Sequence, residues 1–304
     1  MRRLRYWLPL FFVVVSLSVG STAPLPASPP PALRTAGPGV QPDVFYDPAS
    51  FFNGLEVLRS RGLPPARPGA LVGGLVPHHN LAGEMFSRLF VQFEAAPPKT
   101  VIVVGPNHDN RGQRVITGRR GWSTAFGVVE ADQALVTKLE AAGLATVDDR
   151  SLEPEHAIGA LMPYLKYHAP AAKVVPVILH RGVTLREMER LAGFLAPLLS
   201  PDTVLVASVD FSHYLTRTRA EANDAVTLKA IQAFDLPALM EMGPDFVDSP
   251  PSLGVLMLAM RQIGADGPVV EGNTNSGRLF GSDLAETTSY FTFSYRLPGG
   301  GNTR

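Results

Sequence analysis

The stretch VIVVGPNHDNRG at residues 101–112 is the part of the chain that decides the fold class. Its first four residues are β-branched and apolar, which predicts a buried strand. Gly105 and Pro106 end that strand at once. His108 and Asp109 therefore follow directly after the strand's carboxyl end.

Two other stretches show the same order of features. LVGGLVPHHN at 71–80 is an apolar run that stops at a proline and leads to His78. TVLVASVDFSH at 203–213 is an apolar run that leads to Asp210 and His213. In open α/β sheets, ligands bind outside the carboxyl ends of the strands. We therefore expect these three strand ends to form the walls of one site.

Strand-like and helix-like segments alternate along most of the chain. Strands are predicted at 70–76, 101–104, 174–179, 204–209, 268–271 and 287–295, and helices at 81–93, 132–142, 153–167, 185–199, 217–234 and 253–263. Residues 114–131 are expected to form loops and short strands. The alternation predicts an α/β fold with a mostly parallel or mixed central sheet and helices on both faces.

Composition limits the classes of function. The chain has 304 residues, of which 45% are apolar, enough for the core of one large α/β domain or two small ones. Its 27 basic and 27 acidic residues balance, so the chain lacks the basic excess that is typical of nucleic-acid binders. It contains no cysteine, which excludes disulfides, thiolate ligands and a cysteine nucleophile. A metal site in this chain must use His, Asp, Glu or backbone oxygen.

The ends of the chain differ in composition from the rest. Residues 1–23 have the layout of a secretory signal peptide, with arginines before an apolar run and small residues after it. An uncleaved membrane anchor is the alternative, although the apolar run is short for a full span. Residues 24–43 are expected to be a Pro/Ala-rich linker, 44–297 a single domain and 298–304 a flexible tail. We expect the domain to be exported, to the periplasm or the extracellular space, or to be anchored facing outside the cytoplasm.

Three of the polar residues near strand ends are candidates for acid/base chemistry. Asp210 and His213 are three residues apart at a strand-to-helix turn, so the carboxylate can fix the tautomer of the imidazole and raise its basicity. That pairing suits a metal ligand or a general base, and a helix N-cap is the alternative role for Asp210. His156 follows Glu155 at a predicted helix start, where it either faces the sheet edge or belongs to a polar capping pair.

The motifs resemble those of the MEMO family, found in bacteria as AmmeMemoRadiSam system protein B. The similar segments follow one another in the family's order and lie within residues 70–295: PHHNLAG at 77–83, GPNH at 105–108, EHAIGALMPYL at 155–165, VVPVIL at 174–179, SVDFSHY at 208–214 and NSG at 275–277. The resemblance implies the fold of the class III extradiol ring-cleaving dioxygenases, which hold non-haem iron.

The resemblance also implies a metal site of two histidines and one cysteine. The two histidines correspond to His78 and His108, whereas the cysteine is absent. The equivalent stretch, DSPPSLGVLM at 248–257, places Asp248 in that position. Two histidines and one carboxylate form the facial arrangement that holds Fe(II) and leaves coordination positions open. A helix cap or a loop residue is the alternative role for Asp248.

The resulting hypothesis is an exported MEMO-like protein with a mononuclear metal ion held by His78, His108 and Asp248. Fe(II) is the first choice of metal and zinc the alternative. The reaction would be the O₂-dependent cleavage of a small catechol-like molecule, with His213 or His156 accepting a proton and Asp210 beside them. A non-catalytic metal- or ligand-binding protein on the same scaffold and a metal-dependent hydrolase are the two alternatives. No nucleic-acid partner is expected, and any membrane contact would be made through the uncleaved N-terminal segment.

Overall fold

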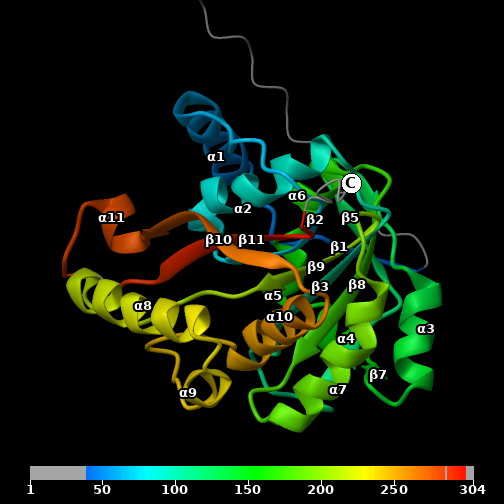
Figure 1. Ribbon diagram of the computed structural model, residues 1–304. Helices are drawn as coiled ribbons and strands as arrows, with labels where there is room; N and C mark the ends of the chain where they lie inside the picture. The colour runs from blue at the N-terminus through cyan, green and yellow to red at the C-terminus, as the bar shows by residue number, and fades with distance from the viewer. Residues whose placement is uncertain (1–38, 285, 299–304) are drawn as a thin grey trace, which may run out of the picture. The chain divides into compact units, whose positions relative to one another are not determined.

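The computed structural model describes residues 39–284 and 286–298 (Figure 1). The predicted signal peptide or anchor, the first part of the predicted linker and the tail from residue 299 lie outside the described residues. Within the described ranges, no helix is both long enough and apolar enough to cross a membrane.

The centre of the fold is an eight-stranded mixed sheet with the strand order β10-β11-β2-β9-β3-β8-β4-β7. The four strands in the middle, β2, β9, β3 and β8, are parallel to one another. Three further pairs are antiparallel: β11 with β2, β10 with β11, and β4 with β8. The strands are β2 Leu71–Val76, β3 Thr100–Pro106, β4 Val115–Thr117, β7 Thr146–Val147, β8 Lys173–Leu179, β9 Thr203–Ser208, β10 Asp266–Asn275 and β11 Ser289–Arg296. The predicted mostly parallel or mixed sheet is confirmed.

Helices cover both faces of this sheet, as predicted (Figure 1). One apolar cluster includes side chains of α3, α7 and α10, and a second cluster, on the opposite face, includes side chains of α1, α2 and α6. The α-helices are α1 Pro48–Arg61, α2 Gly83–Phe90, α3 Gln133–Ala141, α4 Asp149–Leu152, α5 His156–Gly159, α6 Met162–His168, α7 Leu185–Leu195, α8 Arg217–Gln232, α9 Leu236–Met240, α10 Pro250–Gln262 and α11 Ser276–Phe280, and the 3₁₀ helices are η1 Asn80–Ala82, η2 Val91–Glu94 and η3 Ala196–Leu198.

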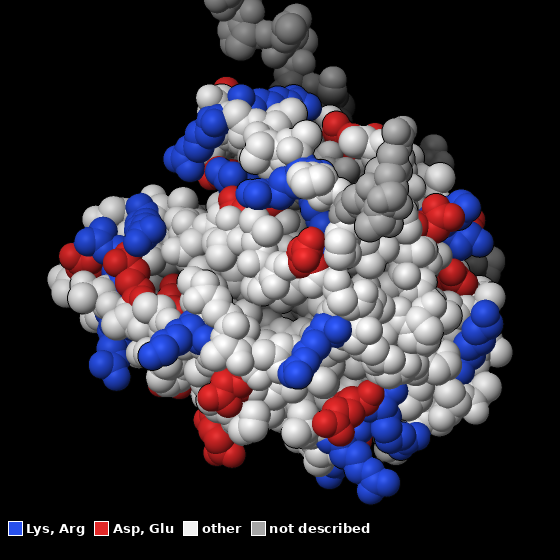
Figure 2. Space-filling view, viewed as in Figure 1, with Lys and Arg blue, Asp and Glu red and all other residues white. Residues whose placement is uncertain are grey.

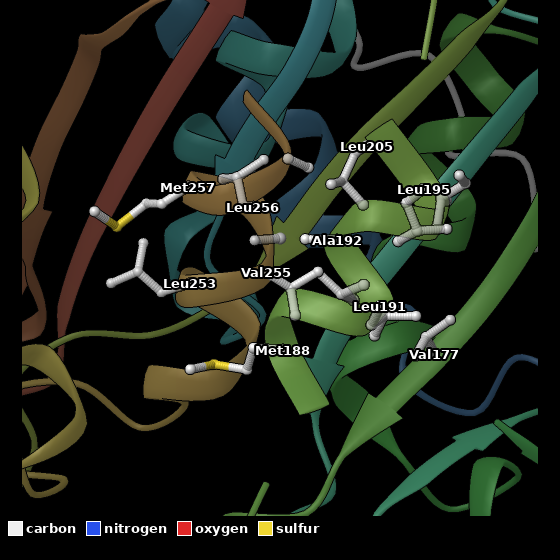
Figure 3. Packing of buried hydrophobic residues seen from close by; sticks show 14 of the residues in the cluster. Val177, Met188, Leu191, Ala192, Leu195, Leu205, Leu253, Val255, Leu256 and Met257 are labelled. Carbon is white, nitrogen blue, oxygen red and sulfur yellow. The ribbon is translucent and has the colours of Figure 1, made fainter. Parts of the chain in front are cut away.

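Apolar side chains of α7 and α10 pack together against the sheet. Figure 3 shows Leu191 and Leu195 of α7 and Val255 of α10 in one cluster with Val177 of β8 and Leu205 of β9. All five are buried, and full burial of such a side chain contributes roughly 1.5–3 kcal/mol. This packing fixes the position of α10, and of the loop that precedes it, relative to the strands.

The start of α7 shows how local sequence sets a helix boundary. The Thr184 side chain accepts a hydrogen bond from the backbone N–H of Glu187, and the Glu187 carboxylate accepts one from the backbone N–H of Thr184. This reciprocal capping box satisfies two backbone donors that would otherwise lack partners. The helix therefore begins at Leu185, as the sequence predicts.

A second, three-stranded sheet changes the expected start of the fold. It has the order β1-β5-β6 and consists of β1 Val40–Pro42, β5 Gly121–Thr124 and β6 Gly127–Val129. Residues 40–42 pair in parallel with residues 121–123, and Gln41 is buried. The fold thus begins before residue 44, and the predicted linker 24–43 extends too far. A proline-rich composition does not reveal a pairing that depends on a distant strand.

The helix predicted over residues 153–167 is divided into α5 and α6. Pro163 lies in the first turn of α6. Because proline has no backbone N–H and its ring clashes with the carbonyl four residues earlier, a continuous helix cannot pass through this position. The break leaves a four-residue helix, α5, that begins at His156.

The crossing of α1 and α2 requires a glycine, which gives a test of the packing. A Cβ atom added to Gly54 would lie 2.3 Å from the carbonyl carbon of Gly83. We expect Gly54→Ala to lower the free energy of unfolding by about 1–3 kcal/mol, because the two helix backbones must separate. Gly193→Ala in α7, where the added Cβ meets nothing closer than 3.9 Å, should instead raise it by up to about 1 kcal/mol. Urea unfolding of both variants checks this, and equal effects would contradict the close crossing.

Candidate metal centre

Three parallel strands bring polar side chains to one edge of the main sheet. β2, β3 and β9 each end two residues before a predicted site residue, namely His78, His108 and Asp210. Val76 lies opposite Ser208 in the parallel register of β2 and β9, so the two chain exits are neighbours. The backbone N–H of His78 donates a hydrogen bond of 3.0 Å to the Asp210 carboxylate.

Three imidazoles converge at this edge. One ring nitrogen from each of His78, His108 and His156 lies within 4.8 Å of the other two, and the three residues form a group that can hold a metal ion. His78 is buried, His156 is half-buried and His108 is exposed. The rings of His108 and His156 stack with centroids 4.1 Å apart, and the ring of His78 stands edge-on to both. His156 reaches the group because α5 begins at that residue.

Hydrogen bonds orient two of these imidazoles. His108 Nδ1 lies 2.7 Å from Glu155 Oε1, and His78 Nδ1 lies 3.2 Å from Ser208 Oγ. When Nδ1 donates its proton in these bonds, Nε2 keeps a free lone pair, which is the usual state of a metal-ligating histidine. Glu155 also caps α5 by accepting a hydrogen bond from the backbone N–H of Ala157. One buried carboxylate thereby fixes both the ring of His108 and the start of the helix that carries His156.

Asp248 brings a carboxylate to the same point from the loop before α10. Its Oδ2 atom lies 3.1 Å from His78 Nε2 and 3.9 Å from His108 Nε2. Ser249, not Asp248, is the N-cap of α10, so the capping role is excluded for Asp248. Both carboxylate oxygens are buried and lack a hydrogen-bond partner of good geometry within the described ranges. A divalent cation between these groups would supply the missing partner.

The electrostatics of the cluster also fit a cation. Burial disfavours a charged His78 ring, but the carboxylates of Asp210, Asp248 and Glu155 outweigh burial and raise the pKa of His78 to about 9. Burial and the neighbouring rings of His78 and His108 lower the pKa of His156 to about 4. Without a metal ion, the cluster therefore takes up a proton at His78. Perturbations of this kind are typical of functional sites.

The donor set suits Fe(II), Zn(II) or a related divalent ion, because imidazole and carboxylate are ligands for all of them. The group of His78, His108 and His156 can hold such an ion, and Asp248 is a further ligand candidate because its carboxylate lies beside His78 and His108. Asp248 was predicted from the sequence as a ligand. His156 was predicted to face the same pocket as an acid or base, and the structure places its ring among the ligand candidates.

The two remaining predicted residues lie beside the cluster. Asp210 is buried and does not cap α8, whose N-cap is Thr216. It holds the backbone of His78 instead. His213 is half-buried and lines a cavity of about 150 Å³ together with His108 and Asp248. Its Nδ1 atom is buried and has no hydrogen-bond partner in the described part of the chain.

Sequence reasoning missed the importance of Glu155. The sequence indicates a polar capping pair with His156, and Glu155 does cap α5. Its carboxylate also binds both the ring and the backbone N–H of His108. The two residues are 47 positions apart, so no local pattern connects them.

The structure thus defines an α/β protein with a histidine- and carboxylate-lined, metal-type site at the carboxyl ends of its parallel strands. A family model described as Memo-like protein matches residues 59–249. The chain belongs to this family, and the resemblance seen in the sequence motifs is confirmed.

Similar proteins include MEMO1 family proteins from archaea. The protein from Methanopyrus kandleri is 29% identical over 240 residues, which cover 75% of this chain and 84% of that protein. The protein from Pyrobaculum aerophilum is 26% identical over 210 residues, which cover 66% and 75%, respectively. These proteins match most of the length of the described fold.

A solved structure supports the fold alone. The crystal structure of an uncharacterized protein from Escherichia coli K12 aligns with a TM-score of 0.54 and 11% sequence identity. The alignment covers 73% of this chain and 99% of that structure. The shared architecture agrees with the α/β class that the sequence predicts.

Loss of the two shared ligand candidates should abolish metal binding. We expect the double variant His78→Ala/His108→Ala to lose near-stoichiometric bound metal, as measured by mass spectrometry after reconstitution. His79→Ala is the matched control, because the His79 ring bonds the Tyr290 hydroxyl and is not part of the three-histidine group. Retention of metal by the double variant, or equal loss in the control, would contradict the site.

The raised pKa of His78 predicts a proton release on metal binding. Below about pH 9 the metal-free ring is protonated, and only the neutral ring binds metal, so apparent affinity should rise with pH up to that value by up to about tenfold per pH unit. His156 is already neutral at pH 7 because its pKa is about 4. Titration calorimetry at pH 7 in two buffers of different ionisation enthalpy measures the released proton. A pH-independent affinity between pH 6 and 8 would contradict this electrostatic picture.

Proposed function

We propose that this Memo-family protein is a mononuclear Fe(II) enzyme that cleaves a small catechol-like ring with O₂. The observation that carries the proposal is the convergence of His78, His108 and Asp248 beside a cavity that His213 also lines. Three protein ligands on one side of a metal leave positions open for substrate and O₂. His108 and Asp248 line the cavity, so a molecule bound in it would lie beside the proposed metal site.

Iron, when bound, supplies the coordination of the substrate hydroxyls and the activation of O₂. The residues around it have separate tasks. His213 lines the cavity beside His108 and Asp248, and its ring would accept the proton of a substrate hydroxyl. Asp210 holds the backbone of His78, and Glu155 holds the ring of His108. These two carboxylates keep the imidazoles in place while the substrate exchanges.

The proposed reaction needs no co-reactant besides O₂. The carbon–carbon bond next to one hydroxyl-bearing carbon breaks, and both oxygen atoms of O₂ enter the product. One broken end becomes a carboxylate, and the other becomes an aldehyde or ketone. The ring is oxidised and O₂ is reduced, so the atoms and electrons balance without an external reductant.

A metal-dependent hydrolase is the second candidate, and the three-histidine group favours it. Three imidazoles around zinc, with a water molecule in the fourth position, form a known type of catalytic zinc site. In that case His156 would be the third ligand and Asp248 would orient the water. The hydrolase would work without O₂, which separates the two candidates.

We propose, from the N-terminal sequence, that the activity is located outside the cytoplasm. The order of arginines, apolar run and small residues in positions 1–23 supports export or anchoring outside the cytoplasm. The absence of cysteine is compatible with an oxidising compartment. The proposed substrate is therefore a small molecule that the enzyme meets outside the cytoplasm.

Oxygen uptake tests the proposed reaction. We expect the iron-loaded chain to consume O₂ with at least one member of a catechol panel, and a chelator to abolish the uptake. His213→Gln should lower kcat by about 10²–10⁴-fold, because it removes the proton acceptor, and should leave the iron content unchanged. No uptake across the panel by iron-loaded protein, together with anaerobic hydrolysis by zinc-loaded protein, would replace this proposal with the hydrolase.

A further inference from the structure

The cavity beside the metal centre has two chemically different ends. Its lining includes His108 and Asp248 of the metal cluster, which we call the inner end, and the exposed Arg181 and Tyr214, which we call the outer end. The volume of about 150 Å³ is small for a ligand pocket, which favours a single ring over fused rings. The two ends therefore suit a short molecule with different groups at its two sides.

Arg181 is the cationic group at the outer end. It is exposed, and its guanidinium makes no ion pair with any residue in the described part of the chain, whereas the nearby Arg111 pairs with Asp109 and Arg114 pairs with Glu187. The backbone of Arg181 is held in place, because its N–H donates a 2.7 Å hydrogen bond to Asn110 Oδ1. Asn110 also lines the cavity. A guanidinium that has no ion-pair partner in the described residues, on a backbone held beside the cavity, is suited to bind an oxyanion.

Tyr214 is the aromatic group at the outer end. Its backbone has a φ of 60°, which is in the left-handed region and strained for a bulky residue. Hydrogen bonds from His213 N to Pro244 O and from Thr287 N to Leu215 O hold the chain on both sides of it. The side chain is 71% exposed, with its ring 5.6 Å from that of His213. Strained residues held in this way occur at ligand clamps, and the exposed ring offers a flat apolar surface.

The charges of the cavity set the orientation of a ligand. Asp248 is the carboxylate of the metal cluster that lines the cavity, and Arg181 is the cation that lines it. With the substrate hydroxyls at the open positions of the metal, a carboxylate on the far side of the ring would be attracted to Arg181. The hydroxyl groups of the same ring then face the metal ligands. The outer end thus distinguishes a ring that bears an acid group from one that does not.

We infer that Arg181 and Tyr214 form a specificity subsite for a carboxylate-bearing single-ring substrate. This inference rests on the proposed function, because the opposite side of the ring must carry the hydroxyl groups that bind the metal. Arg181 pairs with the carboxylate, and Tyr214 packs against the ring. Asn110 is a positioning residue that keeps the backbone of Arg181 at the cavity.

The test measures binding, so it does not depend on turnover. The zinc-loaded full chain is titrated without O₂ with 3,4-dihydroxybenzoate and with catechol, and the two Kd values are compared. We expect the wild type to bind the carboxylate-bearing ring about tenfold more tightly, or better. The ratio of the two Kd values should fall to about one in Arg181→Met and remain partly in Arg181→Lys. Arg111→Met, which removes an arginine outside the cavity lining, should keep the wild-type ratio.

Tyr214→Ala provides a second readout, since loss of the ring should weaken both ligands by a similar factor. Equal Kd values for the two ligands in the wild type, no binding of either, or equal loss of preference in Arg111→Met would overturn the subsite. The carboxylate preference with no O₂ uptake by iron-loaded protein would overturn the dioxygenase and leave the subsite standing. O₂ uptake with catechols but without the carboxylate preference would overturn the subsite and leave the dioxygenase standing.

Discussion

The parallel hydrogen bonding of β2, β9 and β3 is the constraint on which the rest of the site depends. Val76 lies opposite Ser208, and Val104 lies opposite Ala207, so the three strands end at the same level. Side chains alternate between the two faces of a strand, and a shift of register by one residue would turn each of them to the other face. The buried apolar residues on both faces prevent such a shift. The positions of His78, Asp210 and His108 follow from this alignment.

The same alignment brings charged groups together in the protein interior, where their burial lowers the stability of the folded protein. Asp210 and Glu155 are buried, and burial of a carboxylate is unfavourable unless hydrogen bonds and opposite charges compensate. Here the compensation comes from imidazoles and from backbone N–H groups such as those of His78 and His108. Within the described residues, Asp248 accepts no hydrogen bond from a backbone N–H, and its compensation is limited to the nearby His78 ring at 3.1 Å. A cation bound in this site would supply the compensation that Asp248 lacks. This is the physical reason for the arrangement.

The surface outside the site has a different character. In the view of Figure 2, basic and acidic side chains are interspersed, and most of them lie toward the edges of the face shown. Many are paired locally, as Arg119 is with Glu140 and Arg120 with Glu153. Such exposed pairs contribute little to stability. The asymmetry that could orient a ligand is found in the lining of the cavity, between the carboxylate of Asp248 and the guanidinium of Arg181.

Several parts of the fold were predictable because their causes are local. The β-branched run before Gly105 and Pro106 predicts β3 and its end, and Thr184 with Glu187 predicts the start of α7. The proline in α6 could have indicated the break that divides the predicted helix. The short β1 was not predictable, because its stability comes from pairing with residues 121–123 and not from its own composition.

The sequence by itself determined which side chains are available for chemistry and where the strands release them. His78, His108 and Asp210 stand directly after apolar runs, and the absence of cysteine limits the ligands to nitrogen and oxygen. Only the tertiary structure decided the strand order, the bond between His108 and Glu155, and the position of Asp248 against two imidazoles. These contacts join residues far apart in the chain, so they depend on the packing of helices and strands and not on the propensity of any one segment.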